Sequence, residues 1–143
     1  MIYEVESRPW GMYEILLDSD TTKVKRITVA PGGRLSYQFH HKRAEVWTCI
    51  EGRLSVILDD VLHELTPGDC LVIPQGAKHR AYNATTELAK FIEVQTGTYF
   101  GEDDIVRIED DYNRVELEHL NDGNYIGGLT MPDKNTNKLN KNG

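Results

Sequence analysis

The chain has 143 residues, enough for one domain with a hydrophobic core and short for two. Hydrophobic residues make up 39% of it and charged residues 27%, the balance of an ordinary soluble protein. The net charge of −7 argues against a nucleic-acid partner, which would need a basic face. No apolar run approaches the roughly 20 residues of a membrane span, and the N-terminus lacks the basic start and apolar stretch of a secretory signal. We therefore expect a cytoplasmic protein that binds neither nucleic acid nor membrane.

Signals for short β-strands dominate the first hundred residues. Segments rich in β-branched and aromatic residues alternate with turns that contain Gly, Pro or Asp, and no segment of about 12 residues there shows a helical period. The predicted strands span residues 13–17, 24–29, 35–40, 45–50, 53–58, 61–65, 70–73, 79–83 and 88–94. Short strands at such regular spacing predict an all-β, single-domain fold, closed as a sandwich or barrel so that no sheet edge is exposed.

Three parts of the chain differ in composition. We expect the barrel, with an N-terminal strand, to occupy residues 1–114, followed by a peripheral segment over residues 115–132. Residues 133–143 are polar and of low complexity, so we expect a disordered tail there. Cys49 and Cys70 lie in apolar strand-like runs, and we expect two buried thiols rather than a disulfide.

Two groups of metal-ligating residue types stand in separate strands. Successive side chains of a strand alternate between its faces, so Gln38 and His40 point the same way, and Glu45 opens the next strand. The Pro and Gly of the turn at residues 74–76 direct His79 back across the barrel. Two imidazoles, a carboxylate and an amide oxygen would give one divalent metal ion four ligands and leave positions open for a substrate. Such mixed nitrogen and oxygen donors suit Zn²⁺, Fe²⁺, Mn²⁺, Co²⁺ or Ni²⁺.

A single histidine on a strand is more commonly a packed or surface residue than a metal ligand. We interpret His63 and His119 in that way. His41 is the alternative to His40, because a β-bulge would exchange the faces of the two residues. In a regular strand His40 shares the face of Gln38, and we favour His40 as the ligand.

The segments from Gly33 to Gly52 and from Gly68 to Asn83 resemble the paired motifs of the cupin superfamily. The second segment matches the glycine, proline, glycine, histidine and asparagine spacing of that family without a gap. The resemblance implies a small β-barrel of the double-stranded β-helix, or jelly-roll, type. A typical cupin has His-x-His where this chain has Gln38-x-His40, a pattern that looks like phosphomannose isomerases, whose zinc is held by a glutamine, two histidines and a glutamate.

Further segments are similar to the type II mannose-6-phosphate isomerase domain, which in many bacteria is the C-terminal part of a bifunctional mannose-1-phosphate guanylyltransferase. These segments are residues 8–13, 37–45, 73–79 and 93–107, within a resemblance that covers residues 5–114. The resemblance implies a homodimer that isomerises mannose 6-phosphate to fructose 6-phosphate, with zinc as the first expectation for the metal. Guanylyl transfer is not implied. Lys42 and Val46 replace two histidines that are frequent in the family.

Isomerisation of a phosphosugar through an enediol needs a base and cations that hold the phosphate. Arg43, between two expected metal ligands, is the first candidate for the phosphate. Lys25 shares a face with inward apolar residues and is a second candidate, and Arg80, expected to face opposite to its neighbouring histidine, is a third. Glu93 is the candidate base, with a buried structural carboxylate as its alternative, and Gln95 on the same face is a further candidate for substrate binding.

Other interpretations stay open at this point. The acidic segment at residues 101–104, with Arg107, either lies over the barrel mouth or forms a solvated loop tied by a salt bridge, and we favour the loop. The replaced histidines motivate a second functional hypothesis, a non-catalytic sugar or sugar-phosphate binding module. A third is oxygen chemistry at Fe²⁺, which Gln38 fits less well, because those sites usually combine at least two histidines with a carboxylate.

Overall fold

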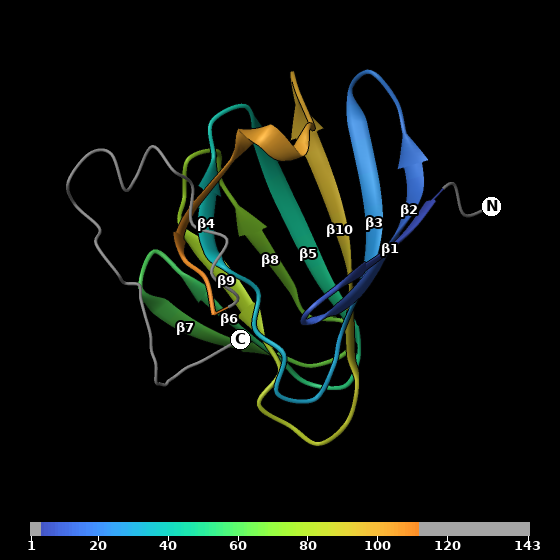
Figure 1. The fold of residues 1–143 in the computed structure, drawn as a ribbon, viewed down its shortest axis with the longest axis vertical. Coiled ribbons are helices and arrows are strands. Elements are labelled where there is room, and N and C mark those ends of the chain that lie inside the picture. The colour runs from blue at the N-terminus through green and yellow to red at the C-terminus, as the bar shows by residue number, and fades with distance from the viewer. Residues whose placement is uncertain (1–3, 112–143) are drawn as a thin grey trace.

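The computed structural model of the protein describes residues 4–111, which form two facing antiparallel β-sheets (Figure 1). In chain order the elements are β1 (Glu4–Arg8), β2 (Gly11–Asp18), β3 (Thr22–Val29), β4 (Tyr37–His40), β5 (Arg43–Glu51), β6 (Leu54–Leu58), β7 (Val61–Leu65), β8 (Cys70–Ile73), β9 (His79–Tyr82), β10 (Ala89–Gly97), the 3₁₀ turn η1 (Glu102–Asp104) and β11 (Ile105–Glu109). Sheet A has the order β1-β2-β3-β10-β5-β8, and sheet B has the order β11-β4-β9-β6-β7. The all-β prediction is confirmed.

Each predicted strand overlaps an observed one, whereas β1 and β11 are additional. β1 is an edge strand that pairs only with β2, and none of its side chains is buried, so it lacks the alternation that marks a strand in sequence. Cys49 is buried as expected, but Cys70 is exposed, since it lies on the outer face of edge strand β8. The segments 115–132 and 133–143, and His119, lie outside the described residues.

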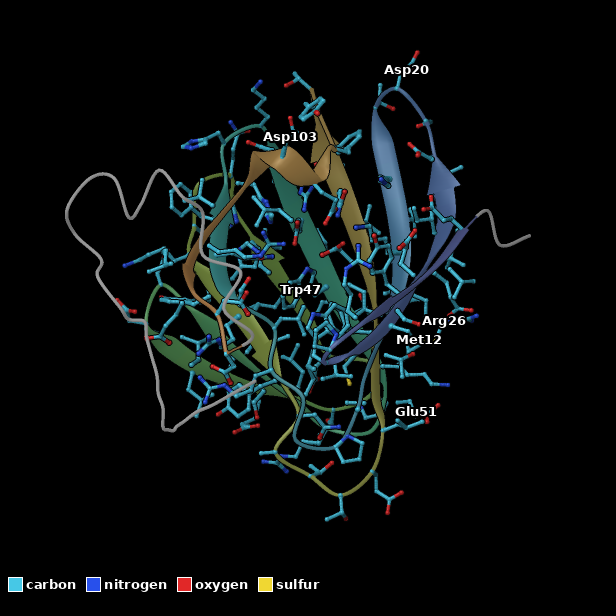
Figure 2. All side chains as sticks on the ribbon, viewed as in Figure 1. Met12, Asp20, Arg26, Trp47, Glu51 and Asp103 are labelled. Carbon is cyan, nitrogen blue, oxygen red and sulfur yellow. The ribbon has the colours of Figure 1, made fainter. Side chains whose placement is uncertain are left out.

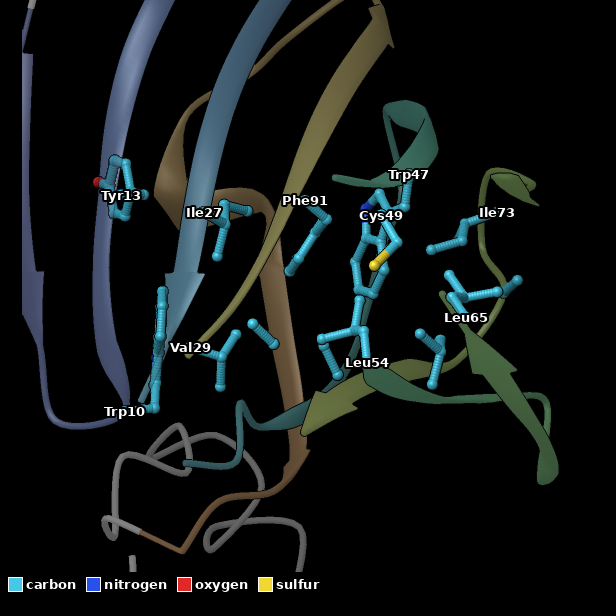
Figure 3. Close-up of a cluster of buried hydrophobic side chains, with 14 of the residues drawn as sticks. Trp10, Tyr13, Ile27, Val29, Trp47, Cys49, Leu54, Leu65, Ile73 and Phe91 are labelled. Carbon is cyan, nitrogen blue, oxygen red and sulfur yellow. The ribbon is translucent and has the colours of Figure 1, made fainter. Parts of the chain in front are cut away.

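Inward side chains change from apolar to polar along the central strands of sheet A. On β10 the buried positions run from Ala89 and Phe91 to Glu93 and Gln95. The same change occurs on β3 and β5, which flank β10, because Phe91 lies opposite two apolar residues and Gln95 lies opposite a glutamate. The space between the sheets therefore has an apolar end, which forms the core, and a polar end (Figures 2 and 3).

The apolar end is built around aromatic rings. Trp47 and Phe91 are almost completely buried, with ring centroids 4.6 Å apart, and aliphatic side chains of both sheets pack around them (Figure 3). Burying a large aromatic side chain contributes about 1.5–3 kcal/mol relative to leaving it exposed. This packing fixes the spacing of the sheets, and with it the spacing of the polar side chains at the other end.

The outer face of sheet A carries a row of valines. Val24, Val94, Val46 and Val72 lie opposite one another across β3, β10, β5 and β8. The last two are 37% and 62% exposed, so the row ends at an open sheet edge. Within residues 4–111 there is no helix with the length and apolar character to cross a membrane.

Gly52 joins β5 to β6 in the left-handed backbone region, with φ +75°, where only glycine is free of strain. A Cβ atom there would stand 2.3 Å from the carbonyl oxygen of Leu88. Gly68, with φ +98°, has the same conformational demand, but a Cβ atom there would meet nothing within 4 Å.

Replacing Gly52 with alanine is expected to destabilise the fold more than the matched change Gly68→Ala. Both variants pay about 1–2 kcal/mol for a side chain at positive φ, and Gly52→Ala adds overpacking of about 1–3 kcal/mol. Urea unfolding midpoints of the two variants measure the difference. Equal midpoints would contradict the close approach of Gly52 to Leu88.

Candidate metal centre and adjoining pocket

Three ligand-type side chains converge at the polar end of the barrel. His40 ends β4, Glu45 lies on β5 and His79 begins β9, and their nearest ligand atoms all lie within 4.8 Å of one another. One Glu45 oxygen is 3.2 Å from His40 Nε2, and the other is 3.7 Å from His79 Nε2. The two groups of residues that the sequence placed on separate strands thus face each other. His41 is exposed, so the strand is regular here and His40 is the inward histidine.

The hydrogen bonds of His79 leave one of its nitrogens available. Its Nδ1 lies 2.9 Å from the carbonyl oxygen of Ala77, and because a carbonyl only accepts, Nδ1 carries the proton. Nε2 then presents its lone pair toward Glu45, and it is buried without a hydrogen-bond partner in the described part of the chain. Buried polar atoms are nearly always paired, so this nitrogen fits a ligand that is a cation.

The charge states of the cluster suit a cation as well. Burial alone would raise the pKa of Glu45, but His40, His79 and Arg43 around it hold that pKa well below the usual range. Burial lowers the pKa of His79 and outweighs the attraction of Glu45. The cluster therefore offers an ionised carboxylate and a neutral imidazole, the forms in which these groups bind metals.

Gln38, the fourth residue expected to hold the metal, lies directly across from His79 in sheet B. Its amide oxygen accepts a hydrogen bond of 2.7 Å from Ser36 Oγ, and its side chain lines a pocket beside the His40–Glu45–His79 cluster. A carbonyl oxygen has two lone pairs, so one remains for a second contact. Gln38 as a ligand stays a prediction.

Trp47 connects the cluster to a second carboxylate. Its indole N–H donates to Glu45 Oε1 at 2.9 Å and to Glu93 Oε2 at 3.1 Å. Gln95 Nε2 donates to the other oxygen of Glu93 at 2.6 Å. Alternation along the strand places Trp47 on the same face as Glu45, which is the signal in the sequence for this role.

The environment of Glu93 changes its protonation. Burial and the negative charge of Glu45 raise the pKa of Glu93 to about 8, although Lys25 opposes the shift. Glu93 lines the pocket, whereas Gln95 is fully buried behind it and does not. The structure therefore supports Gln95 as a residue that positions Glu93, in place of the expected contact with substrate.

The pocket has a volume of about 60 Å³ and opens beside Glu93 and Gln38. Its charged lining residues are Arg8, Lys25, Arg43, Glu93, Glu102 and Arg107. Arg43 is buried and donates to Glu45 at 3.0 Å and to the carbonyl of Phe100 at 3.3 Å. Lys25 is also buried, with Nζ 4.2 Å from the centroid of the Tyr13 ring. Two of the expected substrate-binding residues thus reach one cavity.

Arg80 does not reach this pocket. It follows His79 on β9 and points to the opposite face of sheet B, where it donates to the carbonyl of Leu35 at 2.8 Å and to Glu109 at 3.0 Å. There it lines a separate cavity of about 250 Å³. The structure therefore does not support Arg80 as a contact for the same substrate, because strand alternation sends it away from His79.

The acidic segment packs over the pocket, which corrects our preference for a solvated loop. In the view of Figures 1 and 2, η1 passes across the upper parts of β5 and β10, and Asp103 is labelled on this turn. Asp104 is buried and accepts hydrogen bonds from the backbone N–H groups of His41 and Lys42. Glu102 lies 3.3 Å from Lys25 Nζ. A salt bridge is present, but its partner is Lys25 of β3, and Asp104 holds the segment across the mouth.

The comparisons with known proteins agree with this architecture. The family model described as "Mannose-6-phosphate isomerase C-terminal" matches residues 2–110. The chain belongs to this family. Among solved structures, an RmlC-like cupin from Shewanella frigidimarina aligns with a TM-score of 0.61 and 25% identity, covering 70% of this chain and 86% of that one. A double-stranded β-helix protein from Klebsiella pneumoniae aligns with a TM-score of 0.57 and 22% identity, covering 62% and 77%. The cupin fold is confirmed.

The curated relatives of this chain are longer proteins, and the chain matches only a part of each. The xanthan biosynthesis protein XanB of Xanthomonas campestris is 47% identical over 108 residues, covering 76% of this chain and 23% of the relative. The alginate biosynthesis protein AlgA of Pseudomonas aeruginosa is 46% identical, covering 76% and 22%. The mannose-1-phosphate guanylyltransferase of Escherichia coli is 44% identical, covering 76% and 23%. The chain thus spans about a quarter of the length of these relatives.

Replacing Trp47 with phenylalanine is expected to weaken metal retention by about 10-fold, because removing a hydrogen bond to a metal ligand typically costs 10- to 100-fold in affinity. The change keeps a buried aromatic ring but removes part of the indole, including the N–H group that donates to Glu45 and to Glu93. Competition with a chromogenic Zn²⁺ chelator measures the affinity. Trp10→Phe, at a buried tryptophan outside the cluster, is the control. Equal affinity in both variants would show that the Trp47 N–H does not orient Glu45.

Proposed function

We propose that the domain isomerises mannose 6-phosphate and fructose 6-phosphate through an enediol. The observation that carries this proposal is the convergence, at one end of one barrel, of the His40–Glu45–His79 cluster, the second carboxylate Glu93 and buried cations. A phosphosugar carries the carbonyl, the exchangeable C–H bond and the anion that these three parts suit. The match to the mannose-6-phosphate isomerase family supports the choice of sugar.

Gln38, His40, Glu45 and His79 would hold one divalent ion, with zinc as our first expectation and manganese, cobalt, nickel or iron as alternatives. When bound, such an ion supplies a Lewis acid that polarises the sugar carbonyl. The unpartnered lone pair of His79 and the ionised Glu45 are the features that favour metal binding.

Glu93 is the candidate base. Isomerisation removes the proton from C2 of the aldose and delivers a proton to C1, and one carboxylate can carry out both transfers in turn. A pKa raised to about 8 by burial and by Glu45 makes Glu93 a stronger base than an exposed glutamate, and it exchanges protons near neutral pH. Trp47 and Gln95 hold its two oxygens, which limits rotation of the carboxylate toward the substrate carbon.

Lys25 and Arg43 are the candidate phosphate contacts. Both are buried, so their charges act through little intervening water. They reach the pocket from β3 and β5, on either side of the strand that carries Glu93. A phosphate held between them would fix the sugar relative to the base.

Glu93→Gln is expected to lower kcat for mannose 6-phosphate by about 10²- to 10⁴-fold, the usual contribution of a general base. The amide keeps the size of the side chain, so zinc affinity is expected to stay within about threefold of the parent. A coupled assay that detects fructose 6-phosphate measures kcat, and Glu64→Gln, on the outer strand β7, is the control.

The same assay, applied to the parent protein, distinguishes an isomerase from a non-catalytic binding module. Binding of mannose 6-phosphate without turnover, after loading with Zn²⁺, Mn²⁺ or Co²⁺ in turn, would overturn the isomerase and favour a sugar-phosphate binding module. Oxygen uptake by the iron-loaded protein would instead favour oxygen chemistry.

We further propose that two copies of the domain pair through the valine row on sheet A. A row that is apolar across four strands and ends at the open edge strand β8 offers a second copy both a dry surface and an unpaired strand. Val72→Asp is expected to convert a dimer into a monomer by light scattering. Val61→Asp, at a valine on sheet B that is 57% exposed, is the control. A monomeric parent protein would refute the pairing.

A further inference from the structure

We propose that the carboxylate of Glu102 occupies an anion-binding position that the phosphate group of a sugar phosphate takes over. The choice of a sugar phosphate as the ligand rests on the proposed function. The anion site itself rests on the contacts of Lys25 and on the charges around the pocket.

Lys25 is a buried cation that lies opposite Glu93 in the sheet and contacts one other acidic side chain. Its side chain is 6% exposed, and Glu102 is the only carboxylate within 4.0 Å of its Nζ among residues 4–111. A buried ammonium group requires a counter-anion, because desolvation of an unpaired charge costs several kcal/mol. The Tyr13 ring below it favours a cation but brings no negative charge. The position beside Lys25 is therefore built for an anion, and Glu102 fills it.

The lining of the pocket carries more cationic than acidic side chains. Arg8, Lys25, Arg43 and Arg107 are cationic and two lining residues are acidic, and Arg8 and Arg43 also pair with carboxylates outside the lining. Burial would raise the pKa of Glu102, but Lys25 and Arg43 lower it, so the side chain is a carboxylate. A phosphate dianion carries up to twice the charge of that carboxylate and has three oxygens to share among these cations.

Glu102 is held less firmly than its surroundings. Its side chain is 45% exposed, whereas that of Lys25 is 6% exposed, and it belongs to a single 3₁₀ turn. Water can solvate this carboxylate whether or not it contacts Lys25, so it is displaced more easily than a fully buried partner would be. Asp104, two residues later, is buried and bonded to two backbone N–H groups. The side chain of Glu102 can therefore leave Lys25 while the segment stays anchored at Asp104.

Glu102 also limits access to the cavity, because its side chain lines the same pocket as Lys25. Withdrawal of Glu102 from Lys25 opens the pocket on the side of the mouth and exposes the ammonium group at the same time. Space and charge thus become available together, and only an anionic ligand replaces the lost ion pair.

The variant Glu102→Gln tests this inference with inorganic phosphate as the probe. The amide keeps the shape of the side chain and removes the charge that competes for Lys25. Phosphate is expected to bind about three- to tenfold more tightly than to the parent by isothermal titration calorimetry, and KM for mannose 6-phosphate is expected to fall.

Asp103→Asn is the matched control. It lies in the same turn and changes the net charge by the same amount, but its carboxylate contacts the hydroxyl of Tyr99 instead of Lys25. Phosphate affinity is expected to stay at the parent value in this variant. Adding Lys25→Met to Glu102→Gln is expected to abolish the gain.

Weaker or unchanged phosphate binding in Glu102→Gln would overturn the inference, since Glu102 would then be a support for Lys25 and not a competitor. An equal gain in Asp103→Asn would overturn it as well, because the effect would be one of net charge. The titrations need no turnover, so they separate the two proposals. If the domain shows the expected phosphate affinities but no isomerase activity, the proposed anion site is supported and the proposed function is refuted.

Discussion

The burial of Glu45 is the constraint on which the polar end of the barrel depends. An ionised carboxylate that is 1% exposed is stable only if the groups around it compensate for lost hydration. Arg43 and Trp47 do so by donating hydrogen bonds to it, and each comes from a position that the strands fix. The cluster is therefore not a set of independent residues. Removing one member would leave a charge in a dry environment, so both the fold and the chemistry favour keeping the whole arrangement.

The central strands of sheet A carry both core side chains and candidate catalytic side chains. The register of the sheet places the two kinds at opposite ends of the same strands. Phe91 and Glu93 are two residues apart on β10 and point the same way, one into the apolar end and one into the polar end. Because β10 lies between β3 and β5, the neighbours of Glu93 come from both sides, Lys25 from one and Trp47 from the other. A base placed in the middle of a sheet is held by two ladders of hydrogen bonds, which gives it a precision that a loop position would lack.

How much could be predicted from sequence depended on the range of the interaction. Alternation within a strand is local, so the shared face of Gln38 and His40 and the outward direction of Arg80 follow from spacing alone. The prediction that Arg80 contacts the substrate ignored this alternation, and the structure does not support that prediction. The shared N–H of Trp47 needed the pairing of β5 with β10, which no single stretch of sequence encodes. The position of Glu102 needed the path of the chain after β10, which brings an acidic segment typical of solvated loops to Lys25, 77 residues earlier in the sequence.

Arg43 joins two parts of the molecule that lie far apart in sequence. One edge of its planar guanidinium contacts the Glu45 carboxylate, and the group also donates to the carbonyl of Phe100, just before the turn that covers the mouth. A flat, rigid group of this kind transmits a displacement, because it cannot bend between its two contacts. A shift of the Glu45 carboxylate would therefore reach the segment after Phe100 through this side chain. Arg43 thus links the candidate metal centre to the segment that covers the pocket.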